Sequence, residues 1–295
     1  MIRIPTAVLE GKKIPRIIFS IRPSSASVDQ EILSLMKKAY DLGAWCFDLP
    51  SSIHLQSFRE LKHLTDDESL IALCHLEVEE GTSFLGKPLH RFESKVVSTI
   101  KKNLFLPDSV RNLPPVPFSS EVFTQREIDR INLDPLRFDR ALSASHPTDS
   151  PFLLIGERYG DWLLALGRID LLKKMVSRVR EKGFIPIFSG QWATFSLPKA
   201  KPLDVAAYAI PINKKGCLFD LTQACDLIKR FDRPVMSLNP LADGKLSRNP
   251  EEAFSFLFDE LKIYSAIAEI ASEKEARSIS GALEKFPSLI SRQRT

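Results

Sequence analysis

The chain has 295 residues, 44% of them hydrophobic and 26% charged, which is typical of a globular protein and excludes disorder as its main state. Its 41 lysines and arginines and 37 acidic residues leave a net charge of +4, too small an excess to favour nucleic acid as a partner. The start lacks the apolar segment of a secretion signal, no stretch approaches the roughly 18 uncharged apolar residues of a membrane span, and the four cysteines form no C-x-x-C pair. We therefore expect a cytoplasmic protein with reduced thiols and no membrane partner.

The first third of the chain alternates strand-like and helix-like segments. Residues 14–20 predict the first strand, and Ser27 with Gln30 has the spacing of a capping box at the start of a helix. Residues 45–49 and 70–74 predict the second and third strands, with a helix between them. Both faces of these strands are apolar, which is typical of a parallel sheet covered by helices.

The same pattern of strand and helix returns in the second half. Further strands are predicted at 151–155, 184–189, 204–209, 234–238 and 266–271, and helices at about 221–231, 250–262 and 273–285. Eight such units in a chain of this length predict the α/β class and a single (β/α)8 TIM barrel domain over residues 1–295. An open doubly wound sheet has the same local pattern and is the alternative.

One stretch breaks this rhythm. Roughly 75 residues separate the third and fourth predicted strands, far more than a plain connection needs. Only 94–103 has a helical pattern there, so we predict an insertion at about 107–136. Such a segment is either a lid over the barrel mouth or a surface loop.

Three segments together resemble a known family. Residues 39–48 combine a helix end, a glycine and a strand that ends in Asp48, and residues 236–246 combine a strand with the loop P-L-x-x-G-x-L. Residues 137–155 lead into the fourth strand in a similar pattern. This layout resembles the aldo/keto reductases, which implies an eight-stranded barrel with a small-molecule ligand at its C-terminal face and NADP as cofactor of an oxidoreductase.

The catalytic residues of that family are only partly matched. The resemblance implies an Asp, a Tyr acid, a Lys and a His, because the alkoxide left by hydride transfer must be protonated. Asp48 matches the Asp, whereas the other three positions fall at Ile53, His75 and Gly156. The neighbouring His54 is expected to be solvated. We therefore expect altered or lost catalysis, with weak or absent reduction of common aldehydes.

The cofactor contacts implied by the resemblance lie at strand ends and at the last helix. The candidates are Ser189, Gln191, Asn239, Ser272 and Arg277. Ser272 and Arg277 resemble an S-x-x-x-x-R contact to the adenosine 2′-phosphate at a helix N-terminus, where anions are favoured. Glu273 and Glu275 stand in the same turn and oppose a phosphate, and Ser272 with Glu275 also has capping-box spacing.

Asp48, His75 and Glu157 end three successive predicted strands, so a barrel brings them into one pocket. Two carboxylates and an imidazole form an acid–base set or bind a divalent metal, although we assign none of them as a metal ligand. Alternatively, Asp48 and Glu157 cap the following helices or pair with Arg22 and Arg158.

Three classes of function therefore stay open from the sequence. The first is a reductase with a displaced proton donor. The second is a metal-assisted or acid–base enzyme that uses Asp48, His75 and Glu157, and the third is a barrel retained for binding or assembly.

Overall fold

A closed barrel of eight parallel strands forms the centre of the chain. The computed structural model describes residues 4–23, 28–76, 81–103, 121–218 and 220–284. The barrel strands in spatial order are β3 (Ile17–Ile21), β4 (Cys46–Leu49), β5 (Ile71–Leu76), β9 (Phe152–Gly156), β10 (Ile185–Ser189), β11 (Ala207–Asn213), β13 (Val235–Leu238) and β14 (Ser265–Ile270). Pairing of β10 with β11 joins the two halves, and β14 pairs with β3. The fold is thus the predicted (β/α)8 barrel, and the open sheet is excluded.

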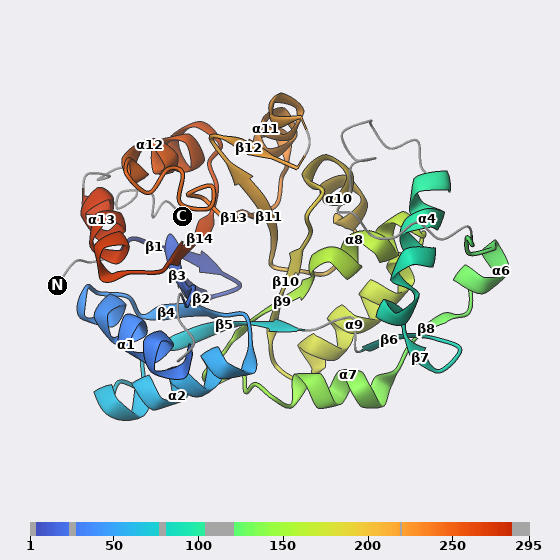
Figure 1. The fold of residues 1–295 in the computed structure, drawn as a ribbon, viewed down its shortest axis with the longest axis horizontal. Coiled ribbons are helices and arrows are strands. Elements are labelled where there is room, and N and C mark those ends of the chain that lie inside the picture. The colour runs from blue at the N-terminus through green and yellow to red at the C-terminus, as the bar shows by residue number, and fades with distance from the viewer. Residues whose placement is uncertain (1–3, 24–27, 77–80, 104–120, 219, 285–295) are drawn as a thin grey trace.

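Helices surround this barrel as an outer ring (Figure 1). They are α1 (Val28–Asp41), α2 (Ser52–Thr65), α8 (Glu157–Ala165), α9 (Ile169–Glu181), α10 (Ala193–Ala200), α11 (Leu221–Arg230), α12 (Pro250–Phe254) with the π-helical turn η2 (Ser255–Glu260), and α13 (Glu273–Glu284). Sequence patterns missed α8, because it follows β9 directly, without a connecting loop. In the described part of the chain, no helix combines the length and apolarity needed to cross a membrane.

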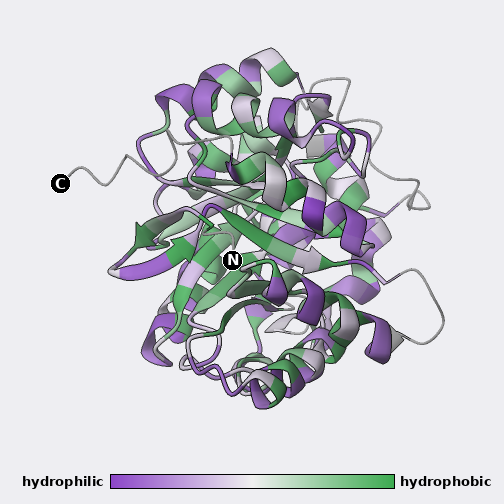
Figure 2. Cartoon of the chain, turned by 90° about the vertical axis from the view of Figure 1, so that its left-hand side faces the viewer, coloured by the Kyte–Doolittle hydropathy of each residue, from purple (hydrophilic) through white to green (hydrophobic). Residues whose placement is uncertain are grey.

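The first helix shows how these helices attach. The buried side chains of Ile32, Leu35, Met36 and Ala39 recur at helical spacing, so α1 presents an apolar stripe to the core. The predicted capping residue Ser27 lies outside the described residues. Figure 2 shows the same division over the molecule, with hydrophobic strands in the interior and hydrophilic residues on the outer faces of the helices.

An N-terminal hairpin corrects the first predicted strand. Residues 14–20 were expected to form one strand, but β1 (Thr6–Leu9) pairs antiparallel with β2 (Lys12–Pro15), and β3 begins only at Ile17. The hairpin turn lies at Glu10 and Gly11, which both have positive φ, as a two-residue turn requires. Leu9 and Ile14 belong to the apolar cluster that fills the barrel. The hairpin therefore closes one end of the barrel.

The bounds of the sixth barrel strand also differ from the prediction. The prediction of 204–209 is three residues early, because β11 spans Ala207–Asn213. Backbone pairing decides this, since Tyr208 aligns with Val235 and Ile187 with Ala207. A short strand, β12 (Gly216–Cys217), pairs antiparallel with the end of β11.

The insertion between β5 and β9 has its own secondary structure. It contains β6 (Thr82–Phe84), β7 (Lys87–Pro88), the 3-10 turn η1 (Leu89–Phe92), α4 (Glu93–Asn103), α6 (Gln125–Ile128), β8 (Ile131–Leu133) and α7 (Pro135–Leu142). The order β7-β6-β8 makes a small antiparallel sheet beside the barrel (Figure 1). Of the predicted 107–136 insertion, residues 107–120 lie outside the described residues, and 121–136 contain α6, β8 and the start of α7.

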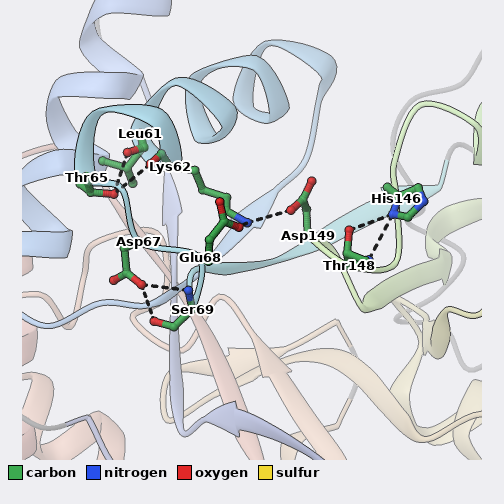
Figure 3. Close-up of polar contacts among 9 residues, drawn as sticks. All are labelled: Leu61, Lys62, Thr65, Asp67, Glu68, Ser69, His146, Thr148 and Asp149. Carbon is green, nitrogen blue, oxygen red and sulfur yellow. Dashed lines mark hydrogen bonds and ion pairs between the residues drawn. The ribbon is translucent and has the colours of Figure 1, made fainter.

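A polar contact fixes the point at which the insertion returns to the barrel. Lys62 of α2 reaches Asp149 at 2.8 Å and Glu68 at 3.1 Å (Figure 3). The backbone carbonyl of Asp149 also accepts a hydrogen bond from the Ala72 amide at 2.8 Å. The start of β9 is thereby held beside β5, which aligns the polar residues at the other ends of these two strands.

Candidate functional site

Alternation along the strands turns polar side chains into the barrel mouth. Ile18, Cys46 and Leu73 belong to the apolar cluster inside the barrel. Side chains two residues apart lie on the same face of a strand. Ser20 and Asp48 therefore point inward at the carboxyl ends of β3 and β4, as does the third member of this layer, His75, near the end of β5.

These side chains form one continuous hydrogen-bonded chain with Glu157. The Ser20 hydroxyl donates to Asp48 Oδ2 at 2.7 Å. Asp48 Oδ1 lies 2.6 Å from His75 Nε2, and Glu157 Oε1 lies 2.6 Å from His75 Nδ1. The structure thus brings Asp48, His75 and Glu157 together, as the strand order predicted.

The imidazole of His75 is cationic in this arrangement. Burial disfavours its charged form, but Asp48 and Glu157 face its two nitrogens and together raise the pKa of His75 to about 10. The Asp48 side chain is 5% exposed, His75 17% and Glu157 50%. The three charged groups therefore become more exposed from Asp48 through His75 to Glu157, and a ligand in the mouth can reach the Glu157 carboxylate.

The turn between β9 and α8 aims Glu157 at His75. Gly156 has φ +121°, and a Cβ there would lie 2.5 Å from the backbone oxygen of Ser189. Glu157 itself has φ +46°, a left-handed conformation that costs a non-glycine residue energy. One turn later, a Cβ on Gly160 would lie 3.0 Å from the Phe188 ring. The two glycines therefore allow α8 to start close against β10 with its first side chain turned to the mouth.

In the structure, Asp48 and Glu157 neither cap the following helices nor pair with Arg22 and Arg158, as the alternative prediction had it. Arg22 pairs with Glu269 at 3.4 Å, and Arg158 pairs with Glu93 at 3.0 Å. The cap positions of α2 and α8 are taken by Ser51 and Gly156 rather than by the two carboxylates. No set of three histidine, cysteine or acidic side chains in the described ranges is arranged to hold a metal ion.

A pocket of about 270 Å³ adjoins His75, between the start of α2 and the end of α7. Leu49, Cys74 and Leu153 contribute to its apolar lining, and Ser51 and Ser145 add hydroxyl groups. These three apolar side chains belong to the cluster between the strands and the surrounding helices, so the pocket lies on the outer side of the barrel wall rather than in the mouth.

The expected cofactor contacts at α13 are engaged within the chain. Arg277 donates from Nε and Nη2 to Glu273 Oε1 at 2.9 and 2.6 Å. Glu275 accepts the Ala271 amide at 2.7 Å, and Ser272 Oγ accepts the Glu275 amide at 3.3 Å. A carboxylate thus occupies the start of the helix, where a phosphate was expected.

The remaining cofactor candidates lie at the ends of β10 and β13. Asn239 exchanges two hydrogen bonds with Asp243, at 2.7 and 2.8 Å, within its own turn. The backbone N–H of Gln191, not its side chain, donates to Asp161 at 2.6 Å. Ser189 differs from these, because its buried hydroxyl has no hydrogen-bond partner in the described part of the chain.

Two residues at the site escaped sequence reasoning. His54 was expected to be solvated, but it is 7% exposed and its Nε2 lies 2.9 Å from the Ile21 carbonyl oxygen. Its other nitrogen bonds Ser51 at 2.8 Å, and an S-x-x-H spacing at a helix start was a usable signal. Asp161 is fully buried beneath the segment after β10, and no local pattern marked it.

Comparisons with known proteins give a likeness of fold. No protein-family model matches the sequence, and no curated protein matches it. The holo form of aldo-keto reductase AKR11C1 from Bacillus halodurans superposes with a TM-score of 0.57 at 10% identity, over 96% of this chain and 91% of that chain. An aldo-keto reductase from Klebsiella pneumoniae in complex with NADPH gives 0.54 at 14% identity, over 100% and 98%.

A third structure, an aldo/keto reductase from Brucella melitensis, gives a TM-score of 0.52 at 11% identity, over 97% of this chain and 99% of that chain. All three cover the barrel from end to end. The chain therefore has the fold of the aldo-keto reductases, as the resemblance in its sequence implied.

Proposed function

We propose that this chain is a divergent aldo-keto-reductase-like barrel that binds a small molecule at its C-terminal face and transfers protons there through Asp48, His75 and Glu157. The observation that carries this proposal is His75, which is held at 2.6 Å from a carboxylate on each side. Asp48 is buried and fixes the ring, while the half-exposed Glu157 reaches a ligand in the mouth. A protonated imidazole hydrogen-bonded to carboxylates combines a proton donor with proton acceptors, as is typical of acid–base catalysis.

Reduction by the usual mechanism of this fold is altered or lost in our proposal. Ile53, which stands at the position of the tyrosine acid, has no proton to donate and is 41% exposed. His75 stands at the lysine position and is itself protonated, so it supplies the cation there and can act as a proton donor when Glu157 moves.

The residues at α13 do not fit the adenosine phosphate of NADP. Glu275 occupies the helix start, and Glu273 already holds Arg277. A phosphate there has to displace one carboxylate and compete with the other for the guanidinium. The proposed proton transfer therefore does not involve this cofactor.

A second candidate function is an NADP-dependent oxidoreductase with a displaced proton donor. It is favoured by Ser189, the last residue of β10. The buried hydroxyl of Ser189 lacks a hydrogen-bond partner within the described residues and suits a polar ligand atom. The Klebsiella pneumoniae structure of the same fold contains NADPH.

For location, we propose a reducing compartment such as the cytoplasm. All four cysteines are free thiols in the structure, and free thiols are typical of such a compartment.

Ligand-observed NMR with a panel of small aldehydes, ketones and polyols tests the first proposal. His75→Ala and Glu157→Gln should weaken binding of the molecules that the unaltered chain binds, and melting curves should show that both variants fold. His63→Ala and Glu60→Gln, which alter exposed residues of α2, are the matched controls and should change nothing. Unchanged binding in the first two variants means that the set has only a structural role, as in a barrel retained for assembly.

A further inference from the structure

Asp161 is a buried carboxylate that the proposed chemistry does not use. It lies on α8, four residues after Glu157, so both carboxylates lie on one face of the same short helix. The Asp161 side chain is fully buried. A buried carboxylate is costly, so its hydrogen-bond partners show what it holds in place.

Among the described residues, its hydrogen-bond partners come from the segment between β10 and α10 and from α10 itself. Ser196 Oγ donates to Asp161 Oδ1, and the backbone N–H of Gln191 donates to Oδ2 at 2.6 Å. The Trp192 backbone also bonds the carboxylate. A Cβ on Gly190 would lie 2.7 Å from Asp161 Oδ1, so only glycine lets this segment approach so closely.

The carboxylate acts as a cap supplied from another helix. Trp192 is the N-cap residue of α10 and has no side-chain cap bond of its own. The first amides of a helix lack partners within it and favour a negative charge. Asp161 accepts the backbone N–H groups of Gln191 and Trp192, immediately before the first turn of α10, and it thereby ties α8 to the start of α10.

This tie bears on Glu157 because the elbow before it is strained. Glu157 has φ +46°, and a left-handed residue persists only where its surroundings hold it. Gly160 packs α8 against the Phe188 ring, and Asp161 bonds the segment that follows β10. These two contacts hold the start of α8 in the orientation that brings Glu157 to His75. The contact of Gly160 is apolar, and the contact of Asp161 is a hydrogen bond.

We propose that Asp161 is a positioning residue, which locks α8 to the Gly190–Trp192 segment and so keeps Glu157 on His75. The inference rests on the proposed function, since it concerns the same acid–base set. It extends that function by assigning a residue that touches none of the three groups.

The titration of the His75 ring, followed by NMR on histidine-labelled protein, tests the inference without a known substrate. Signals of His75 are assigned by their absence in His75→Gln. In the unaltered chain the midpoint should lie near 10, and Glu157→Gln should lower it. Asp161→Asn should lower the midpoint by about one unit or more, roughly a tenfold loss of proton affinity, and Ser196→Ala should lower it by less.

Ser265→Ala is the matched control, because it removes a buried hydroxyl that bonds Pro15 at the opposite end of the barrel. It should cost stability without moving the His75 midpoint. Tryptophan emission gives a second readout, since release of the segment should shift Trp192 to the red in Asp161→Asn but not in Asp161→Asn combined with Trp192→Phe.

The outcomes separate the two proposals. A shifted Trp192 emission with an unmoved His75 midpoint in Asp161→Asn overturns the positioning role and leaves a capping role only. If neither the emission nor the midpoint changes, the lock itself is overturned. A His75 midpoint near its ordinary value of 6.5 in the unaltered chain overturns the acid–base function, and the positioning role with it. If Asp161→Asn does not fold, Ser196→Ala decides by the same criteria.

Discussion

At the scale of single residues, the barrel mouth depends on charge in places where water is scarce. Burial disfavours the charged form of His75, yet Asp48 and Glu157 raise its pKa to about 10. Burial also dominates at Asp161 and raises its pKa to about 7, against the hydrogen bonds from Ser196, Gln191 and Trp192. His75 is held protonated by its carboxylate neighbours, whereas Asp161 takes up a proton more readily than an exposed carboxyl group, because burial removes more water than its hydrogen-bond donors replace.

The raised pKa of Asp161 makes stability depend on pH. Between about pH 4 and pH 7 the folded chain holds a proton that the unfolded chain has released, so this contribution to the free energy of unfolding falls as pH rises through that window. The full fall is about 4–5 kcal/mol, for a pKa raised from 3.8 to about 7 at about 1.4 kcal/mol for each pKa unit. The Asp161→Asn variant lacks this titration.

Denaturant unfolding of both proteins from about pH 4.5 to about pH 7.5 measures this effect. The free energy of unfolding of the unaltered chain should decline relative to that of Asp161→Asn as pH rises, whatever their difference at any one pH. A difference that stays constant across the range contradicts the prediction.

At the scale of secondary-structure elements, the site is made by the turn between β9 and α8. No loop connects the strand to the helix, since β9 ends at Gly156 and α8 begins at Glu157. Such a turn fixes its side chains more firmly than a long loop does, because two regular elements determine its position. The insertion adds a wall of the pocket beside His75 through Ala141, Leu142 and Ser145, at the end of α7 and after it.

Gly156→Ala should therefore damage both the fold and the site. The added Cβ combines a φ of +121° with a 2.5 Å approach to the Ser189 carbonyl oxygen. Gly167→Ala is the matched control, because Gly167 has φ +74° and a Cβ added there would meet nothing within 4 Å. The control should lose about 1–2 kcal/mol of unfolding free energy, the usual cost of a left-handed residue, and Gly156→Ala should lose more.

Denaturant unfolding gives the energies, and the His75 titration shows whether Glu157 still contacts the ring. Equal losses in the two variants contradict the close approach of β9 and β10. A lowered His75 midpoint in Gly156→Ala, beside an unchanged one in Gly167→Ala, supports the turn as the feature that aims Glu157.

At the scale of the whole molecule, the barrel and its chemistry are separate properties. The superpositions cover nearly the entire chain at 10–14% identity, so the barrel persists with most side chains replaced. A layered apolar interior needs only volume and alternation, which many sequences supply. The mouth needs particular side chains, and there this chain places His75 where the resemblance implies a lysine, and Glu157 next to the position where it implies a histidine.

NADPH should accordingly bind weakly, with weak or absent reduction of common aldehydes. Arg277→Ala should change the affinity little, because Glu273 already pairs with that guanidinium. Glu273→Gln releases Arg277 and should tighten binding by about two- to fivefold, the usual value of one exposed charge pair. Fluorescence titration with NADPH measures both variants. Tight binding that Arg277→Ala abolishes contradicts this prediction and favours the oxidoreductase.

The elements that the sequence predicted well are those with a strong local pattern. Strands such as Phe152–Gly156 are continuous apolar runs between turns, and α1 carries an apolar stripe at helical spacing. The hairpin before Ile17 and the helix α8 were missed, because each directly adjoins a barrel strand and no loop separates them in the sequence.

The sequence by itself determined the alternation of strands and helices, which predicted the barrel with an open sheet as the alternative, and it predicted the meeting of Asp48, His75 and Glu157, because strand order sets which carboxyl ends are neighbours. Only the tertiary structure decided what those residues bond. Pairing of Arg22 with Glu269, burial of His54 and the bonds of Asp161 to the segment after β10 join residues 30 to 247 positions apart. Such contacts depend on register and on side-chain packing between elements, and neither is encoded in any local stretch of the chain.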